Sequence, residues 1–229
     1  MKKRFAFTLA EVLITLGVIG IVAALTLPGI INKSKAKRLK GQYQKAYSEI
    51  AQGIKMMKYD DVSLDTSIYS GNKLAFKNVF REYFRVLDWC DKSKELCYNT
   101  SSNQKIYKSL DGGSYAPTHI FDDGQFVLMD GANVLLENPF GTSDATNAKV
   151  WISIDINGKN GKPNRLGYDI FIFCMLNEEL VPMGARGTEY IDMNKYCNPK
   201  GSGQFNGIAC AYQAMNESDY FDKIVQSVK

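Results

Sequence analysis

Histidine is nearly absent from this chain, whose 229 residues include only His119, in the stretch APTHIFDDG. A catalytic triad or a metal centre built on histidine would have to use that residue, yet no G-x-S-x-G or H-E-x-x-H pattern accompanies it. The stretch GKNGKPN lacks the spacing and the Ser/Thr of a phosphate-binding loop. A lone histidine in a turn before a strand is more often structural. We therefore predict that the protein is not an enzyme.

The chain also lacks a strong overall charge. Its formal net charge is +4, and Lys2, Lys3 and Arg4 supply three of the cations ahead of a long apolar run. A nucleic-acid partner is therefore not expected. Hydrophobic residues make up 45% of the chain and 13 Tyr and 12 Phe are present, which excludes a disordered protein and allows one substantial core.

Cysteine is scarce but informatively spaced. Cys90 and Cys97 bound the polar stretch CDKSKELC, and Cys197 and Cys210 bound CNPKGSGQFNGIAC. Neither pair has the C-x-x-C spacing of a zinc knuckle or a thioredoxin-type site. We predict two disulfides formed in an oxidising compartment such as the periplasm. The alternative is four unpaired thiols in a cytosolic protein. Cys174, within YDIFIFCML, is expected to be a small buried hydrophobe.

Charge is almost missing from residues 7–31, FTLAEVLITLGVIGIVAALTLPGII, where Glu11 is the single exception. The run is long enough to span a lipid bilayer, which takes about 20 apolar residues. It is too long for a secretory signal peptide, and LPGIINKSK offers no small-x-small cleavage site. A plain membrane anchor fits the length but leaves Glu11 unexplained, because a charged side chain in a bilayer costs about 3 kcal/mol or more.

Residues 1–28 resemble the class III leader and the start of type IV pilins and type II secretion pseudopilins. The family has a short basic leader, a small residue, then Phe-Thr-Leu-x-Glu and an apolar helix. Here Ala6 is the small residue and FTLAE places Glu11 fifth from the expected cut. The resemblance implies that prepilin peptidase cleaves between Ala6 and Phe7 on the cytoplasmic side and methylates Phe7. The family usually has Gly before the cut, so Ala6 departs from it. Pro28 stands where members often carry a helix-kinking proline.

The resemblance implies a structural subunit that assembles into a type II secretion pseudopilus or a type IV pilus. Its partners would be prepilin peptidase, other pilin or pseudopilin subunits, the inner-membrane assembly platform and the lipid bilayer. In the filament, Glu11 would meet the new amino terminus of a neighbour's Phe7 and fix the register between subunits. The alternative is a membrane-anchored periplasmic binding or adhesion module that does not polymerise.

The family's orientation places a single-pass helix in the bacterial inner membrane and the C-terminal domain in the periplasm, with the filament or cell surface as the final location. The cations that follow the apolar run argue for the opposite orientation, because the positive-inside rule would keep them in the cytoplasm. They outnumber the three of the leader and are Lys33, Lys35, Lys37, Arg38, Lys40 and Lys45. We follow the motif.

The helical pattern continues past the apolar run. Apolar residues recur three and four positions apart at Leu39, Tyr43, Ala46, Tyr47, Ile50, Ile54 and Met57. We predict one helix of about 50 residues, broken or bent near Pro28. Residues 1–6 form the leader, 7–31 the membrane or filament-core helix, 32–58 its amphipathic continuation, and 59–229 a globular head.

Later segments predict a second helix and several strands. KLAFKNVFREYFRVL is an amphipathic helix that ends before Cys90. QFVLMDGANVLLE is a hairpin around Asp130-Gly131, and KVWISIDI, YDIFIFCML and EELVPMG are further strands. The fold class is therefore α+β, with the long helix packed on four or five antiparallel strands, as in pilins.

The stretch DINGKNGKPNRLGYD lies between two of these strands. Asp155, Asn157 and Asp169 offer the hard oxygen ligands that calcium prefers, and some pseudopilins hold calcium in a C-terminal loop. No acidic residue stands at the twelfth position from Asp155, so the stretch is not an EF-hand. The competing interpretation, which we weigh above the first, is a turn in which Asp and Asn bind their own backbone. No cofactor other than calcium is expected.

Overall fold

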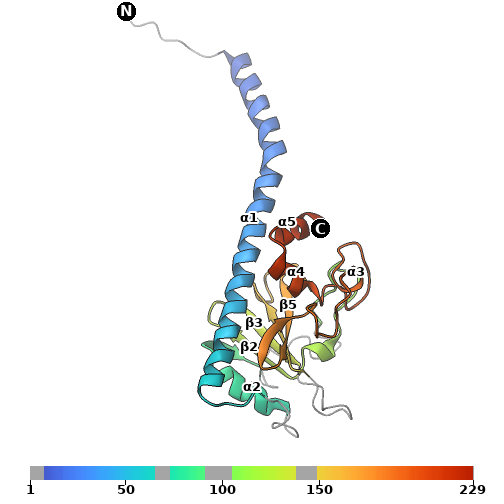
Figure 1. Ribbon diagram of the computed structural model, residues 1–229. Helices are drawn as coiled ribbons and strands as arrows, with labels where there is room; N and C mark the ends of the chain where they lie inside the picture. The colour runs from blue at the N-terminus through green and yellow to red at the C-terminus, as the bar shows by residue number, and fades with distance from the viewer. Residues whose placement is uncertain (1–7, 65–72, 91–104, 138–148, 229) are drawn as a thin grey trace, which may run out of the picture.

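The computed structural model describes residues 8–64, 73–90, 105–137 and 149–228. Its first element is α1 (Leu9–Tyr59), a single helix of 51 residues that projects far beyond the rest of the molecule (Figure 1). The helix is unbroken at Pro28, although its axis changes direction partway along. A proline within a helix removes one backbone hydrogen bond, which bends a long helix more readily than it ends one.

The two halves of α1 have different surroundings. The first half stands clear of the head, so its large apolar side chains are exposed, by between 42% (Val12) and 78% (Leu25). The second half packs on the head through a stripe of buried residues at helical spacing: Ala36, Leu39, Tyr43, Ala46, Ile50, Gly53, Ile54 and Met57. Tyr47 of the expected stripe is half-buried. The same helix therefore combines an unpartnered apolar segment with a segment that belongs to the core.

The head is built on one antiparallel sheet of six strands, in which each strand pairs with its neighbour in sequence. The strands are β1 (Val86–Trp89), β2 (Gly124–Leu128), β3 (Asn133–Glu137), β4 (Trp151–Asp155), β5 (Ile170–Leu176) and β6 (Glu179–Pro182). The predicted hairpin is β2–β3, and the three later predicted strands are β4, β5 and β6. The α+β class, with the long helix packed on an antiparallel sheet, is confirmed.

Both faces of the sheet are covered. One face packs against α1, with Phe126, Ile152 and Phe173 in the shared core. The opposite face carries Leu135, Ile172 and the predicted buried thiol Cys174, and lies under the loops that precede β2 and follow β6. Every residue of β4 is buried as a result, including the polar residues Ser153 and Asp155.

The predicted second helix is shorter than expected. Helix α2 (Lys73–Glu82) ends where the helical pattern was expected to continue, and residues 86–89 form β1 instead. The chain turns at Phe84, whose ring packs 4.7 Å from that of Phe80 and 5.7 Å from that of Phe126, measured between centroids. Pairing with β2 outweighs local helical propensity here, because tertiary contacts decide between the two states.

No helix was predicted for the segment after β6, where the structure contains short helices. A 3-10 turn, η3 (Thr118–Ile120), precedes β2, and α3 (Met193–Tyr196), α4 (Cys210–Asn216) and α5 (Tyr220–Ser227) complete the described chain. Helix α5 buries Tyr220, Phe221, Ile224 and Val225, and lies against α1 near the point where that helix leaves the head (Figure 1).

Candidate functional site

Glu11 closes the amino-terminal end of α1. Its carboxylate oxygen Oε2 accepts hydrogen bonds from the backbone N–H and the hydroxyl of Thr8, both at 2.8 Å, and its own N–H donates to Thr8 Oγ1 at 3.2 Å. This reciprocal arrangement is a capping box, which satisfies backbone donors that the first turn of a helix leaves without partners. The sequence analysis missed it, although Thr8-x-x-Glu11 is the pattern that marks such a cap.

The cap gives the Glu11 carboxylate partners within its own subunit. The side chain is nevertheless exposed, so it remains accessible to a neighbouring chain. Ala6 and Phe7, the residues expected at the processing site, lie outside the described residues. Cleavage there and the pairing of Glu11 with a neighbour's Phe7 therefore stay predictions.

The three predicted oxygen ligands come together in the structure. Asp155 ends β4 and Asp169 directly precedes β5, and because these strands are paired their carboxylates lie at the same end of the sheet. Asn157 connects them: its amide Nδ2 donates to Asp169 Oδ2 and its backbone N–H to Asp155 Oδ1, both at 3.4 Å. The last of these bonds is also the local Asp-to-backbone contact that the turn interpretation expected.

The two carboxylates are fully buried and held by neutral donors. Asp169 accepts from the backbone N–H groups of Asn164 at 2.9 Å and Arg165 at 2.6 Å, and Asp155 accepts from the Tyr107 hydroxyl at 3.1 Å. Burial raises the pKa of Asp155, and the neighbouring charge of Asp169 raises it further. Burial likewise raises the pKa of Asp169, to about 6, against the opposing effect of the two backbone donors. Two neighbouring buried carboxylates repel each other when both are ionised, unless a positive charge between them compensates.

Two amide oxygens in the same loop also lack partners. Asn157 Oδ1 and Asn164 Oδ1 are buried and have no hydrogen bond within the described residues. An unsatisfied buried acceptor is costly, and carboxylate and amide oxygens together are the donor set that calcium prefers. The residues therefore fit a calcium ion. Asn164 is a candidate ligand that sequence reasoning missed, although it lies within the stretch that was singled out.

A second acidic cluster lies at the far end of the same sheet. Carboxylate oxygens of Asp122, Asp123 and Glu137 lie within 4.8 Å of one another. Asp123 and Glu137 interact with other residues as well. This cluster is not accompanied by the orphaned amide oxygens of the β4–β5 loop, and we assign it no role.

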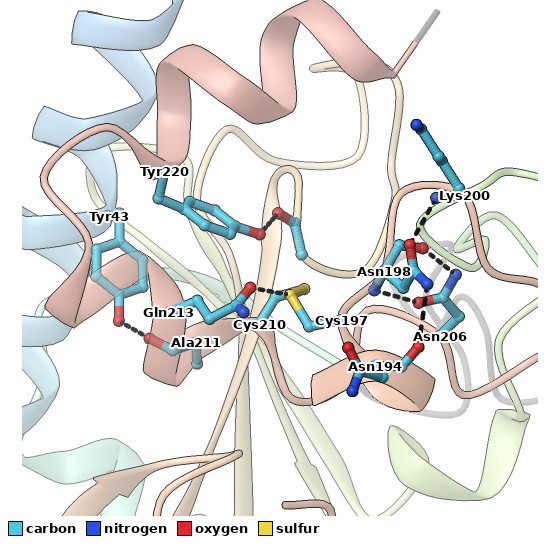
Figure 2. The surroundings of a disulfide bond; sticks show 11 residues. Tyr43, Asn194, Cys197, Asn198, Lys200, Asn206, Cys210, Ala211, Gln213 and Tyr220 are labelled. Atoms are coloured by element: carbon cyan, nitrogen blue, oxygen red, sulfur yellow. Dashed lines mark hydrogen bonds between the residues drawn. A yellow bond between two sulfur atoms is a disulfide. The ribbon is translucent and has the colours of Figure 1, made fainter. Parts of the chain in front are cut away.

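One predicted disulfide is confirmed. Cys197, which follows α3, is bonded to Cys210 at the start of α4, with their Cα atoms 5.0 Å apart (Figure 2). Beside it, the side-chain amide of Asn206 binds the backbone of Asn198: its Oδ1 accepts from the Asn198 N–H at 3.0 Å and its Nδ2 donates to the Asn198 carbonyl at 2.8 Å. Cys97 lies outside the described residues, so the Cys90–Cys97 bond stays a prediction.

His119 is the middle residue of η3; its side chain is exposed, and its ring centroid lies 6.2 Å from that of Phe205. The features with a functional geometry are therefore the capped apolar half of α1 and the β4–β5 loop.

Comparison with protein families identifies the first of these features. Residues 1–27 match the prokaryotic N-terminal methylation motif, which is the prepilin-type signature of type IV pilins and pseudopilins. Searches of curated proteins and of solved structures found no match to the chain. The motif implies processing by prepilin peptidase and assembly with other pilin subunits, and points to a structural subunit rather than an enzyme. The apolar helix that follows is long enough to cross a membrane and fits a membrane-anchored pilin.

Proposed function

We propose that this chain is a prepilin-like subunit that is cleaved between Ala6 and Phe7, methylated on Phe7, and assembled into a type II secretion pseudopilus or a type IV pilus. The observation that best supports the proposal is that the two halves of α1 have different surroundings. A methylation motif leads directly into an apolar half-helix that packs against none of the other described residues, and the remaining half is fixed in the core of the head.

The exposed half of α1 needs an apolar environment. Its side chains are uncovered all around the helix, and a surface of this kind is stable only in lipid or against other apolar helices. In the proposed cycle the bilayer covers it first and neighbouring subunits cover it afterwards. The head, residues 59–229, stays on the periplasmic side and supplies lateral contacts and the outer surface of the filament.

Glu11 sets the register between subunits in this proposal. Its carboxylate pairs with the free amino group that cleavage creates on a neighbour's Phe7, which would satisfy two charges in the apolar core of the filament. Thr8 holds the carboxylate at the helix end through its oxygen Oε2 until the neighbour arrives.

The test is an intact-mass and N-terminal peptide analysis of the protein isolated from its native membranes. A chain that begins at methylated Phe7 supports the proposal. A chain that still carries Met1-Lys2-Lys3-Arg4 would contradict it, and would favour the membrane-anchored module that does not polymerise.

The β4–β5 loop has a structural role in the same proposal. Asp155, Asn157, Asn164 and Asp169 would hold a calcium ion, which supplies the positive charge that the two buried carboxylates lack and uses the two orphaned amide oxygens. Bound calcium would fix the loop against the strands that it connects, and would thereby stabilise the head.

A further inference from the structure

The part of α1 next to the apolar half carries cations only. No acidic residue occurs between Glu11 and Glu49. Within that interval a group that we call the cationic collar follows the apolar run directly: Lys33, Lys35, Lys37, Arg38 and Lys40. Within the described residues, none of the five forms an ion pair. Lys45, by contrast, pairs with Asp130. Five neighbouring cations without acidic partners on one helix segment form a surface that attracts an anionic partner from outside the subunit.

The collar covers the whole side of the helix that does not pack on the head, from one flank of the buried stripe to the other. Successive residues of a helix are about 100° apart. Lys33 and Lys40 therefore lie on one flank of the buried stripe, and Lys35 lies on the other, where its ammonium group is 5.1 Å from the centroid of the Tyr168 ring. Lys37 and Arg38 are exposed on the side that faces away from the head. A protein partner contacts one side of a helix, whereas lipid headgroups surround it, so this distribution favours lipid.

The position of the collar along α1 agrees with this assignment. Residues 12–32 contain no charge, and at about 1.5 Å per residue they extend for about 32 Å, close to the roughly 30 Å of the hydrocarbon layer. The headgroup layer adds about 5 to 7 Å on each side. Lys33 would therefore leave the hydrocarbon at the level of the phosphates, and the rest of the collar would lie within or just above them.

Lys223 partly offsets the acidic groups near the collar, which remain fewer than its five cations. Glu217 and Asp219, next to α5, both lie within ion-pairing distance of Lys223, at 3.3 and 2.9 Å. Asp222 is exposed on α5 without such a pair in the described residues. The end of the head that meets the membrane therefore keeps a clear excess of positive charge.

We propose that the cationic collar binds the phosphates of anionic phospholipids in the leaflet beneath the head. The proposal rests on the proposed function in that it describes the subunit while α1 is in the membrane, before assembly. The collar holds the head on the bilayer surface at a fixed depth and releases those lipids when the subunit enters a filament. Lipid binding would also explain why these cations lie on the side of the membrane where the positive-inside rule disfavours them.

The test uses the full chain reconstituted into nanodiscs that contain phosphatidylethanolamine with roughly 30% phosphatidylglycerol, an anionic composition of the kind that attracts basic segments. Native mass spectrometry then counts the phosphatidylglycerol molecules that stay bound. The collar variant is Lys33→Gln/Lys37→Gln/Arg38→Gln, which leaves the contacts of Lys35 and Lys40 with the head intact. The control is Lys45→Gln/Lys55→Gln/Lys58→Gln, which removes the same charge from the same helix farther from the membrane.

We expect the collar variant to retain phosphatidylglycerol about fivefold less for each neutralised side chain, which corresponds to about 1 kcal/mol per cation near an anionic surface. The control should retain it as the unaltered chain does. Salt at about 0.5 M, where the Debye length is about 4 Å, should reduce retention by the unaltered chain and leave the collar variant unchanged.

Equal retention by the collar variant and the unaltered chain would overturn the lipid assignment. Unchanged retention together with lost incorporation into filaments would instead assign the collar to a contact between subunits. Failure of the full chain to insert into nanodiscs would contradict both the membrane stage of the proposed function and the collar. Insertion without any preference for phosphatidylglycerol would contradict the collar alone.

Discussion

The hydroxyl of Tyr43 on α1 donates a hydrogen bond to the backbone carbonyl of Ala211 on α4, 168 residues later in the chain, at 2.7 Å (Figure 2). Both residues are buried, and the Tyr43 ring also packs edge-on against Phe171 of β5. The contact joins the long helix, the sheet and the C-terminal helices at one point. The core half of α1 is thus held by a specific polar bond as well as by apolar burial.

Tyr43→Phe tests that bond. The substitution keeps the ring and leaves the buried Ala211 carbonyl without its donor, so we expect a loss of about 1 to 2 kcal/mol in the free energy of unfolding. Tyr47→Phe is the matched control, because Tyr47 is only half-buried and its hydroxyl has no hydrogen bond within the described residues. Chemical unfolding followed by tryptophan fluorescence measures both variants. Equal stability of the two would show that the bond contributes nothing.

Alanine substitutions at two glycines of α1 are expected to change the stability of the head in opposite directions. A Cβ atom at Gly53 would collide with the ring of Phe84, whereas one at Gly41 would have no atom within 4 Å. Gly53→Ala should therefore destabilise the head by about 1 to 3 kcal/mol through overpacking. Gly41→Ala should stabilise it by up to about 1 kcal/mol, because alanine is the better helix former. Thermal unfolding of both variants checks the signs, and stabilisation by both would contradict the described packing of Phe84.

Glu11 has a local and a proposed intermolecular role, and two substitutions separate them. Glu11→Gln keeps the capping-box pattern but removes the charge, whereas Thr8→Ala removes the cap and keeps the charge. If the carboxylate pairs with a neighbour's amino group, Glu11→Gln should lose most incorporation into sheared filaments, because an unpaired buried charge costs about 3 to 5 kcal/mol. Thr8→Ala should lose only about 1 kcal/mol of helix stability and still assemble.

Processing of both variants by prepilin peptidase serves as the control in this experiment, measured as the mass of the N-terminal peptide. Normal assembly of Glu11→Gln together with failure of Thr8→Ala would reduce the role of Glu11 to capping its own helix.

Calcium should stabilise the head through the β4–β5 loop. At a free concentration about 100 times the Kd, binding should add about 2.7 kcal/mol to the free energy of unfolding, and chelation should remove it. Asp155→Asn should abolish this response. It should not weaken the calcium-free protein, because it relieves the repulsion between two buried carboxylates.

Asp122→Asn, in the second acidic cluster, is the control for the calcium experiment and should respond to calcium as the unaltered chain does. Loss of the response in Asp122→Asn, with a normal response in Asp155→Asn, would place the ion in the other cluster.

The fold could be predicted from sequence wherever one periodicity extended over many residues. The apolar stripe from Leu39 to Met57 repeats at helical spacing for five turns and predicted α1. Asp130-Gly131, between two apolar runs, predicted the β2–β3 hairpin. Strand β1 was missed because Val86–Trp89 is only four residues long and follows a helical pattern without a break. Its conformation depends on pairing with β2, which local sequence does not encode.

The residues of the candidate sites were likewise predictable from the sequence only in part. The methylation motif is contiguous, so its residues could be named from the sequence alone. Asp155 and Asp169 were also identifiable, because each borders a predictable strand. Asn164 was not, since its amide oxygen becomes significant only when burial leaves it without a donor. The cap on Glu11 was also predictable from the sequence, because Thr8-x-x-Glu11 is the pattern of a capping box.

The packing of α5 on α1 has a consequence for the order of events in biosynthesis. Lys40 on α1 binds the carbonyl of Ser218, 178 residues later, and Phe221 and Ile224 enter the same core as Leu39. In the proposed orientation, the part of that core next to α5 cannot close until this late segment has been made and has crossed the membrane. The anchor is therefore in place before the head can finish folding, and a chain interrupted ahead of α5 would present an apolar groove to the quality-control proteases outside the bilayer.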